Sequence, residues 1–388
     1  MTRLFLLEPA RAPAWAPFAG VRPVAELRAG VWLIRERWEA SLGVTATGIL
    51  DGELVGFRDV ATPPVLTAAA VTGPAIVVRS DFIPARTAIT HDPAPCRFTH
   101  EDTTVGWILP EGALFDPHST AGSVQPVSGH QLHGSADLVG ALDQLLGSDC
   151  AEFTLAASDP VPDGSVILGD TGQVVCLGAE VEPGVVFDVR RGAVVLTEGS
   201  QVRSGTRLEG PLFVGPATHI LGGKVRDSSF GPGCRVHGEV SNTVIVGYSN
   251  KSHDGFVGHC VIGQWVNLGA GTITSNLKNT YGPIRLDLPS GRIETSRQFL
   301  GSMIADHAKT AIGTLLGAGT VIGAGANVFG TGTVPKYFPP FAWGYDGTER
   351  LGLEGFLRIA GRVLPRRGVE VTEELEESLK SLYSRHAP

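Results

Sequence analysis

The spacing of apolar residues predicts two different architectures along the chain, and the first is an α/β fold. Two short apolar runs, RLFLLEP (3–9) and PAIVVRSDFIP (74–84), are rich in branched and aromatic residues and predict buried strands. Residues 24–43 carry apolar side chains at helical spacing and end at Gly43, a suitable C-cap. The segment SADLVGALDQLLGSD predicts a second amphipathic helix, with its first residue, Ser135, as the N-cap. Helices that alternate with buried strands favour a Rossmann-like α/β domain.

After about residue 160 the period of the apolar residues changes to six. The residues at this spacing fall in three blocks: Leu196, Val202, Leu208, Val214 and Ile220; Phe256, Ile262 and Leu268; and Leu316, Ile322, Val328 and Val334. An apolar residue at every sixth position, followed by glycine or another small residue, is typical of a hexapeptide β-helix. Each short strand then turns one apolar side chain inward, and three such strands form one coil of a triangular prism.

The repeat is interrupted once and ends before the C-terminus. Residues 276–298 break the six-residue register and predict an inserted loop, which in solenoids often carries a binding site. After the repeat the pattern becomes helical, and Thr372 is expected to cap the last helix. We therefore expect an α/β domain over 1–160, a β-helix over 161–336 and a helical tail over 337–388 that covers the open end of the prism.

Composition narrows the possible partners and the compartment. The 388 residues carry a formal net charge of −8, which argues against a nucleic-acid or anionic-membrane surface. The five cysteines are scattered and include no CxxC pair, so the sequence indicates neither a disulfide framework nor a thiolate zinc site and favours a reducing, cytoplasmic location. No uninterrupted apolar run reaches the roughly 18 residues of a membrane span.

Two motifs carry a family resemblance that covers most of the chain. They are RPVAELRAGVWLIRERWE (22–39) and the pair GYSNKSHDGFVGH and WVNLGAGTITSNLKNTYG within 247–282. With them the chain resembles a divergent branch of the bifunctional N-acetylglucosamine-1-phosphate uridyltransferase and glucosamine-1-phosphate acetyltransferase family. The resemblance implies a sugar nucleotidyltransferase-like domain followed by a left-handed parallel β-helix. It also implies synthesis of UDP-N-acetylglucosamine from acetyl-CoA and UTP with Mg²⁺, by a homotrimer.

In the acetyltransferase half, the resemblance implies that His253 is the general base for attack of a sugar amine on acetyl-CoA, oriented by Glu239. Histidine suits this role because its pKa lies near neutrality. Asn276 matches an asparagine that contacts the acceptor sugar, whereas His259 is interpreted as an ordinary coil residue. Phe256 stands where the family often has a tyrosine. The remaining candidates are Arg226, Lys251 and Arg285 for the sugar phosphate, and Ser302 and Ala318 for the CoA chain.

In the nucleotidyltransferase half, the glycine-rich phosphate loop of the family and its lysine are absent. Within the corresponding segment 8–28, Arg22 and Arg28 are the candidates for phosphate contacts. Asp81, at the end of a predicted strand, resembles the aspartate that binds Mg²⁺ in the family, and one carboxylate with substrate phosphates is a normal ligand set for this ion. Asp143 falls where the branch often has an asparagine as the second ligand.

Three alternatives stay open at this point. Only one half of the chain could be active, as a sugar-phosphate nucleotidyltransferase or as an acyltransferase. The histidines His237, His253 and His259 could instead form a metal site like that of the γ-type carbonic anhydrases, which are also β-helices. Finally, the chain could be a non-catalytic scaffold that binds sugar nucleotides.

Overall fold

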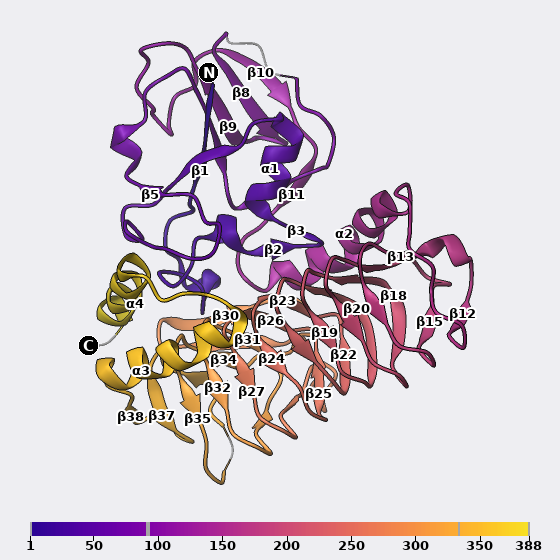
Figure 1. The fold of residues 1–388 in the computed structure, drawn as a ribbon. Coiled ribbons are helices and arrows are strands. Elements are labelled where there is room, and N and C mark those ends of the chain that lie inside the picture. Colours follow the sequence, from indigo (N-terminus) through magenta and orange to yellow (C-terminus); the bar gives the residue numbers. More distant parts are fainter. Residues whose placement is uncertain (1, 91–93, 333, 387–388) are drawn as a thin grey trace.

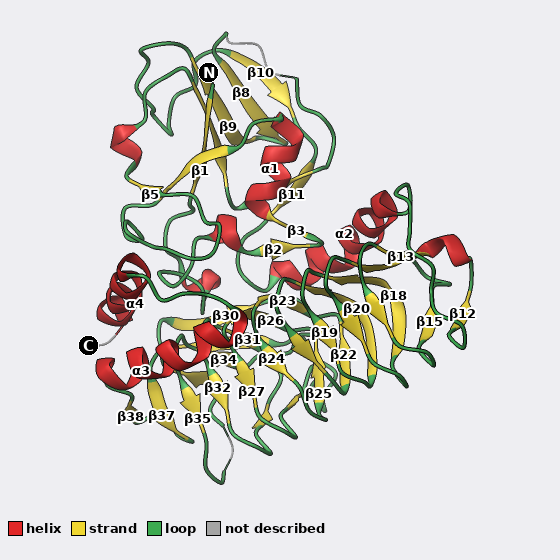
Figure 2. Ribbon diagram, viewed as in Figure 1, coloured by secondary structure: helices red, strands yellow, loops and turns green. Residues whose placement is uncertain are grey.

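The computed structural model describes residues 2–90, 94–332 and 334–386, and it shows an α/β domain on one side of a long β-helix (Figures 1 and 2). The α/β domain contains a seven-stranded sheet in the order β10-β8-β9-β6-β1-β4-β5, in which the strands from β6 to β5 run parallel. The predicted strands over 3–9 and 74–84 are confirmed as β1 and β6. The strands are β1 (Arg3–Leu7), β4 (Ala46–Leu50), β5 (Val65–Leu66), β6 (Ala75–Arg79), β8 (Cys96–His100), β9 (Thr103–Leu109) and β10 (Ser123–Pro126), with β7 (Phe82–Pro84) and β11 (Gly129–Gln131) as a separate pair.

The helix expected over 24–43 forms only in its second half. The segment contains, in order, η2 (Val24–Glu26), β2 (Arg28–Ala29), β3 (Trp32–Leu33) and α1 (Ile34–Leu42). Gly30, at φ +64°, makes the turn between β2 and β3, a conformation that glycine adopts without steric cost. The apolar residues before this turn, Val24, Ala25, Leu27 and Ala29, are all buried in the domain core. They lie in η2, β2 and the residue between them, so their spacing resembled that of a helix although no α-helix forms there. Gly43 ends α1 in the left-handed conformation, as predicted.

From residue 166 onward the chain forms a left-handed β-helix whose strands stack in parallel from coil to coil. One face is a ten-stranded sheet of β14 (Glu180–Val181), β17 (Gln201–Val202), β19 (His219–Ile220), β21 (Arg235–Val236), β24 (Asn250–Lys251), β27 (Asn267–Leu268), β32 (Lys309–Thr310), β35 (Asn327–Val328), β37 (Ala342–Gly344) and β38 (Glu349–Arg350). The other faces carry β12 (Val166–Leu168), β13 (Val174–Cys176), β15 (Val186–Asp188), β16 (Val194–Leu196), β18 (Arg207–Val214), β20 (Lys224–Phe230), β22 (Glu239–Ser241), β23 (Val244–Gly247), β25 (Phe256–Gly258), β26 (Val261–Gln264), β28 (Ile273–Thr274), β31 (Met303–Ile304), β33 (Leu315–Leu316), β34 (Val321–Ile322) and β36 (Tyr337–Phe338).

The six-residue period is confirmed as the pattern of inward-facing side chains. With the exception of Phe256, all residues predicted to face inward belong to one buried core inside the prism. Phe256 is half-buried on the outside, because neighbouring coils are shorter there and Val257 takes the inward position. Lys251 also lies inside, in register with the core residue Val236, and its side chain is 2% exposed.

Three helices pack against the β-helix. The first, α2 (Asp137–Phe153), lies over β18 and β20, and Ser135 does not cap it because the serine hydroxyl donates to the carbonyl of Ala16 (2.6 Å). At the end of the prism, α3 (Leu353–Val363), η5 (Leu364–Arg367) and α4 (Glu373–His386) form a common apolar cluster with Phe341. Thr372 caps α4 as predicted, since its hydroxyl accepts from the N–H of Leu375 (3.3 Å). Across the described residues, none of the helices has the length and apolarity needed to span a membrane.

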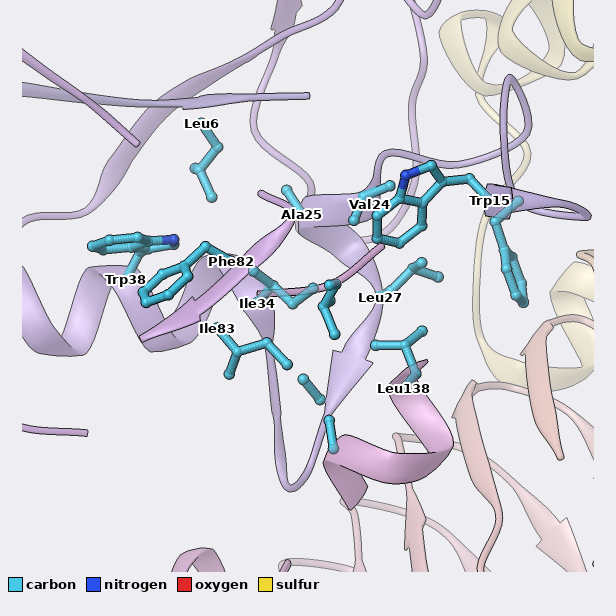
Figure 3. Close-up of a cluster of buried hydrophobic side chains, with 14 of the residues drawn as sticks. Leu6, Trp15, Val24, Ala25, Leu27, Ile34, Trp38, Phe82, Ile83 and Leu138 are labelled. Atoms are coloured by element: carbon cyan, nitrogen blue, oxygen red, sulfur yellow. The ribbon is translucent and has the colours of Figure 1, made fainter. Parts of the chain in front are cut away.

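The inserted segment forms a hairpin of β29 (Arg285–Leu288) and β30 (Gly291–Glu294), which connects the two domains. The buried cluster of the α/β domain continues into the insertion and the β-helix through Ile284, Leu286, Leu300, Met303, Ala318 and Val321. Figure 3 shows the α/β side of this cluster, which includes Leu27, Ile34 and, from α2, Leu138. The two domains therefore share one apolar core.

A buried ion-pair network also connects the two domains. The guanidinium of Arg22 donates to Asp306 of the β-helix (Nε to Oδ2, 3.0 Å) and to Asp59 of the α/β domain. All three side chains are at most 7% exposed. The neighbouring carboxylates raise the pKa of Arg22 against the opposing effect of burial, so this cation stays charged.

We expect Arg22→Ala to destabilise the protein strongly, because it leaves two buried carboxylates without a counter-ion. Breaking a buried pair in this way costs about 3–5 kcal/mol of unfolding free energy. Urea denaturation at neutral pH measures the change, with Arg285→Ala as the control. Arg285 forms an exposed pair with Glu294, and loss of such a pair costs about 0–1 kcal/mol. Equal effects of the two substitutions would contradict a structural role for the network.

Candidate functional site

Several residues predicted for acyl transfer gather on one face of the β-helix. In the parallel ladder of β20, β22 and β25, Glu239 lies in register with Phe256, and Arg226 lies in register with Ser241. His253 occupies the corner that leads into β25. We call this surface the β22–β25 face. It brings the predicted base, the predicted carboxylate and one predicted phosphate ligand to the same side of the prism.

Asn276 and His259 form a polar pair at the edge of the β22–β25 face. The side-chain amide of Asn276 lies 2.8 Å from Nδ1 of His259, and the imidazole stacks on Phe299 with ring centres 5.4 Å apart. Burial lowers the pKa of His259, which favours the neutral ring. Gly258 makes room for the pair, because a Cβ at this position would lie 2.9 Å from the Asn276 amide and 2.4 Å from the ring of Phe256. Sequence reasoning treated His259 as a coil residue and so missed its bond to a predicted substrate ligand.

His253 and Glu239 are both exposed, and within the described part of the chain neither side chain has a hydrogen-bond or ion-pair partner. They are therefore free to contact a substrate. Lys251 is different, because its ammonium donates to the backbone carbonyls of His237 (2.8 Å) and His253 inside the coil. Burial lowers the pKa of Lys251 to about 8. This lysine supports the corner that carries His253 and does not reach the outer surface.

The two arginines predicted for the sugar phosphate lie in different places. Arg226 lies on the β22–β25 face and donates to Asp227 (Nη1 to Oδ2, 2.9 Å). Arg285 lies on the inserted hairpin and pairs with Glu294 at 2.8 Å. Because β29 contacts β34 and β36, this hairpin is directed toward the later coils of the prism. Arg226 is thus the arginine that the structure groups with His253.

The two residues predicted for the CoA chain use backbone groups within the coil. The N–H of Ser302 donates to the thiol of Cys260 (3.2 Å), and its carbonyl accepts from Val261 (3.2 Å). The carbonyl of Ala318 accepts from the ammonium of Lys336 (2.5 Å). Both residues are buried, so the contact with CoA stays a prediction.

A second candidate site is a cavity of about 300 Å³ in the α/β domain. It lies at the carboxyl ends of the parallel strands β1 and β4, where ligands bind in open α/β sheets. Trp15, Leu50 and Leu54 supply apolar surface, and the charged lining residues are Glu8, Arg11, Arg22, Asp51 and Glu53. We call it the β1–β4 cavity.

Glu8 occupies the position in this cavity where backbone donors could hold a phosphate. Its carboxylate accepts from the N–H groups of Val24 (2.5 Å) and Ala25 (3.0 Å) and lies 2.7 Å from the hydroxyl of Ser80. Exposed backbone N–H groups at the start of a helical turn are typical anion ligands. Here a carboxyl group of the chain itself accepts from them. Burial raises the pKa of Glu8 to about 7, against the effect of these hydrogen bonds.

The two arginines predicted to bind phosphate in this domain, Arg22 and Arg28, are held by contacts inside the protein. Arg22 borders the β1–β4 cavity, but its guanidinium is held by Asp59 and Asp306. Arg28 is 7% exposed, donates to the carbonyl of Val31 and lies over the ring of Phe213 in the β-helix. Arg28 therefore packs at the domain interface and does not point into the β1–β4 cavity.

Asp81 follows β6, as predicted, and its carboxylate is paired within the protein. Both oxygens accept from the guanidinium of Arg79. The other predicted ligand, Asp143 of α2, accepts from the side-chain amide of Asn242 in the β-helix (2.9 Å). Among the described residues, no group of three or more His, Cys, Asp or Glu side chains could hold a metal ion. Because Arg79 holds both oxygens of Asp81, this carboxylate does not fit a preformed Mg²⁺ site. The described residues also give no support to a three-histidine metal site.

The structure places a nucleotidyltransferase-like α/β domain before a left-handed β-helix, and each of the two domains carries one candidate site. Residues 4–157 match the sugar nucleotidyl transferase family model. A bifunctional sugar-1-phosphate nucleotidylyltransferase/acetyltransferase of Sulfurisphaera tokodaii is 31% identical over 145 residues, which cover 36% of this chain and 36% of that protein. A bifunctional protein GlmU of Methanococcus vannielii is 30% identical over 120 residues, or 29% and 28% of the two chains.

A longer match extends over more than half of the chain. A bifunctional protein GlmU of Rhodococcus jostii is 26% identical over 236 residues, which cover 58% of this chain and 42% of that protein. Residues 4–157 are therefore similar to the sugar nucleotidyl transferase family, and parts of the chain are similar to bifunctional nucleotidyltransferase–acetyltransferase proteins. The matches span between about a quarter and a half of the length of these three relatives.

The environment of Glu8 predicts a pH-dependent stability. The folded protein holds a proton on Glu8 up to about pH 7, whereas the unfolded chain releases it near 4.5. The native state therefore binds more protons between these values, and stability falls as the pH rises through this range. Thermal midpoints between pH 4 and 8 should show wild-type protein losing stability relative to Glu8→Gln, while the exposed Glu101→Gln follows wild type. A difference between wild type and Glu8→Gln that does not change with pH would contradict this assignment.

Proposed function

We propose that this chain is a transferase of sugar-nucleotide synthesis. It N-acetylates an amino-sugar 1-phosphate, glucosamine 1-phosphate, with acetyl-CoA, and it joins the product to UMP from UTP to give UDP-N-acetylglucosamine. The observation that carries the proposal is the β22–β25 face, which groups a free histidine, a free carboxylate, an arginine and an asparagine. The names of the related proteins provide independent support.

On the β22–β25 face, His253 is the proposed general base. Its exposed ring accepts a proton from the sugar amine as the nitrogen attacks the thioester carbonyl. The carbon–sulfur bond then breaks, and CoA leaves as a thiol after taking up a proton. Glu239, which forms no hydrogen bond with His253 in the described chain, is the carboxylate proposed to orient the imidazole in the complex with substrate. Asn276 binds the sugar, and Arg226 binds its phosphate, for which a guanidinium provides two parallel donors.

The β1–β4 cavity is the proposed nucleotide site. Trp15 and the leucines offer an apolar wall for a base. The candidate cation is Arg11, which is exposed and pairs only with Glu53 among the described residues (3.1 Å), whereas Arg22 is buried between two carboxylates. Mg²⁺ belongs to the proposal with Asp81 as candidate ligand, but Arg79 occupies both carboxylate oxygens.

The proposed assembly is a homotrimer in the cytoplasm. Stacked parallel coils give long flat faces that can pack side by side, and a cleft between neighbouring prisms would suit the CoA chain. The described chain has all five cysteines free and buried, which is compatible with a reducing compartment.

Substitution of the proposed base should reduce acetyl transfer without destabilising the protein. We expect His253→Ala to lower kcat for CoA release about 10²–10⁴-fold, the usual contribution of a general base. Its thermal midpoint should be unchanged, because the side chain is exposed. The matched control is His118→Ala, which removes an exposed histidine of the α/β domain. Acetyl transfer that is equally fast in both variants would rule out His253 as the base.

Asp81→Asn separates the two activities. We expect this variant to lose UDP-N-acetylglucosamine formation from N-acetylglucosamine 1-phosphate and UTP, while it acetylates glucosamine 1-phosphate at the wild-type rate. Asp81 does not line the β1–β4 cavity, so the expected loss rests on its proposed role as the Mg²⁺ ligand, for which Arg79 must release the carboxylate. In the described chain, none of the hydrogen-bond partners of Asp81 belongs to the β22–β25 face, so acetyl transfer should be unaffected. Parallel assays of pyrophosphate release and CoA release provide the comparison. Retained pyrophosphate release would exclude Asp81 from the nucleotide site.

A further inference from the structure

Another cavity, of about 300 Å³, lies between the ten-stranded face of the β-helix and the segment that connects α3 to α4. On the β-helix side it is lined by Tyr248, Trp265, Asn267 and Lys309, and on the other side by Arg366 and Arg367. The β22–β25 face and the β1–β4 cavity contribute none of these residues. We call it the η5 cavity, after the short helix η5 that carries the two arginines.

The charged residues in the lining of the η5 cavity are all cations. Lys309, Arg366 and Arg367 border it, and Arg235 lies on the adjacent strand, in register with the lining residue Asn250. None of these four cations forms an ion pair with a carboxylate within the described residues. Burial and the neighbouring Arg367 both lower the pKa of Arg235. Such a concentration of positive charge is unusual in a chain with a formal net charge of −8, and it indicates an anionic ligand.

The cavity also offers hydrogen-bond donors that the protein does not use. Lys309 donates to the carbonyls of Trp265 (3.4 Å) and His307 (3.1 Å), which leaves its third N–H available. Asn267 accepts from Asn250 through Oδ1 (2.7 Å), so its amide N–H groups remain available. In the described chain, the guanidinium of Arg366 has no partner. Arg367 donates through Nε to the carbonyl of Gly233 (3.0 Å) and through Nη1 to the carbonyl of Arg366 (3.3 Å), which leaves Nη2 available at the edge of the cavity.

The β-helix side of the cavity is rigid. Tyr248 and Trp265 stack with ring centres 4.5 Å apart and an angle of 10° between the rings. Both residues sit at corners of the coil with positive φ, +52° and +62°. The ring of Tyr248 lies against Gly233, where a Cβ would come within 2.7 Å of it. A preformed wall of this kind lowers the entropy that a ligand must lose on binding.

We propose that the η5 cavity binds a diphosphate group. Several cations without counter-ions require a multiply charged anion, and guanidinium forks match the oxygens of phosphoryl groups. The diphosphate could be inorganic pyrophosphate or part of a nucleotide sugar, which share the same charged group. Binding would connect the tail that carries η5 to the ten-stranded face. The inference rests on this cavity alone and does not depend on the proposed transferase activity.

Isothermal titration calorimetry of the full chain with inorganic pyrophosphate tests the proposal. We expect binding that weakens as the salt concentration rises from about 50 to about 300 mM, because screening reduces the attraction between the charges. Arg366→Ala combined with Arg367→Ala should weaken this binding about tenfold or more, since charge-assisted hydrogen bonds are lost. Arg362→Ala removes an exposed arginine of α3 outside the cavity and should bind as wild type does.

Two further measurements keep the test decisive. Arg366→Ala alone removes a side chain without partners in the described chain, so it reports on binding even if the double variant loses stability. UDP-N-acetylglucosamine and inorganic phosphate are titrated in parallel. Loss of nucleotide-sugar binding in the double variant identifies a nucleotide source, and loss of pyrophosphate binding alone identifies the free ion. Absence of binding by both diphosphates, or equal affinities in wild type and both variants, would overturn the proposal.

Discussion

The burial of one apolar side chain by each short strand of the β-helix is the constraint on which the rest of the structure depends. A strand of two or three residues cannot bury enough surface alone, so each coil is stable only on its neighbours. This stacking fixes the register of successive coils, and the register in turn decides which side chains share an outer face. Glu239 is next to Phe256, and Arg226 next to Ser241, because Val225, Val240 and Val257 stack inside the prism. The candidate acyl-transfer face is therefore a direct product of core packing.

The α/β domain is held to this prism by contacts that leave little freedom between the two. One apolar cluster runs from the parallel sheet through the inserted hairpin into the later coils. Arg22 adds a buried cation between a carboxylate of each domain, in an arrangement that is costly to break. Because Arg22 also borders the β1–β4 cavity, the site proposed for the nucleotide is built partly on the domain interface.

The sequence predicted the architecture well and the roles of charged residues less well. A six-residue period of apolar residues predicts a β-helix, so the inward-facing residues could be named from the sequence. Phe256 is the exception, because the coils there are shorter and Val257 faces inward in its place. Arg22 and Arg28 looked like phosphate ligands because nothing local showed that partners such as Asp306, 284 positions away, would bury them. Lys251 was misread because it takes an inward position of the coil, in register with Val236, which the six-residue pattern of apolar residues does not mark. The β2–β3 turn replaced the first half of a predicted helix because Gly30 adopts positive φ and the flanking residues pair as strands.

The contact between His259 and Asn276 could not be predicted from the pattern of apolar residues, because these two residues, 17 positions apart, meet only when the coils stack.

A product assay by mass spectrometry tests the proposed two-step transfer most directly. The purified chain is supplied with glucosamine 1-phosphate, acetyl-CoA, Mg²⁺ and each of the nucleoside triphosphates in turn. The proposed function predicts UDP-N-acetylglucosamine with UTP, accompanied by CoA and pyrophosphate. Recovery of unchanged glucosamine 1-phosphate and UTP from folded protein would contradict it.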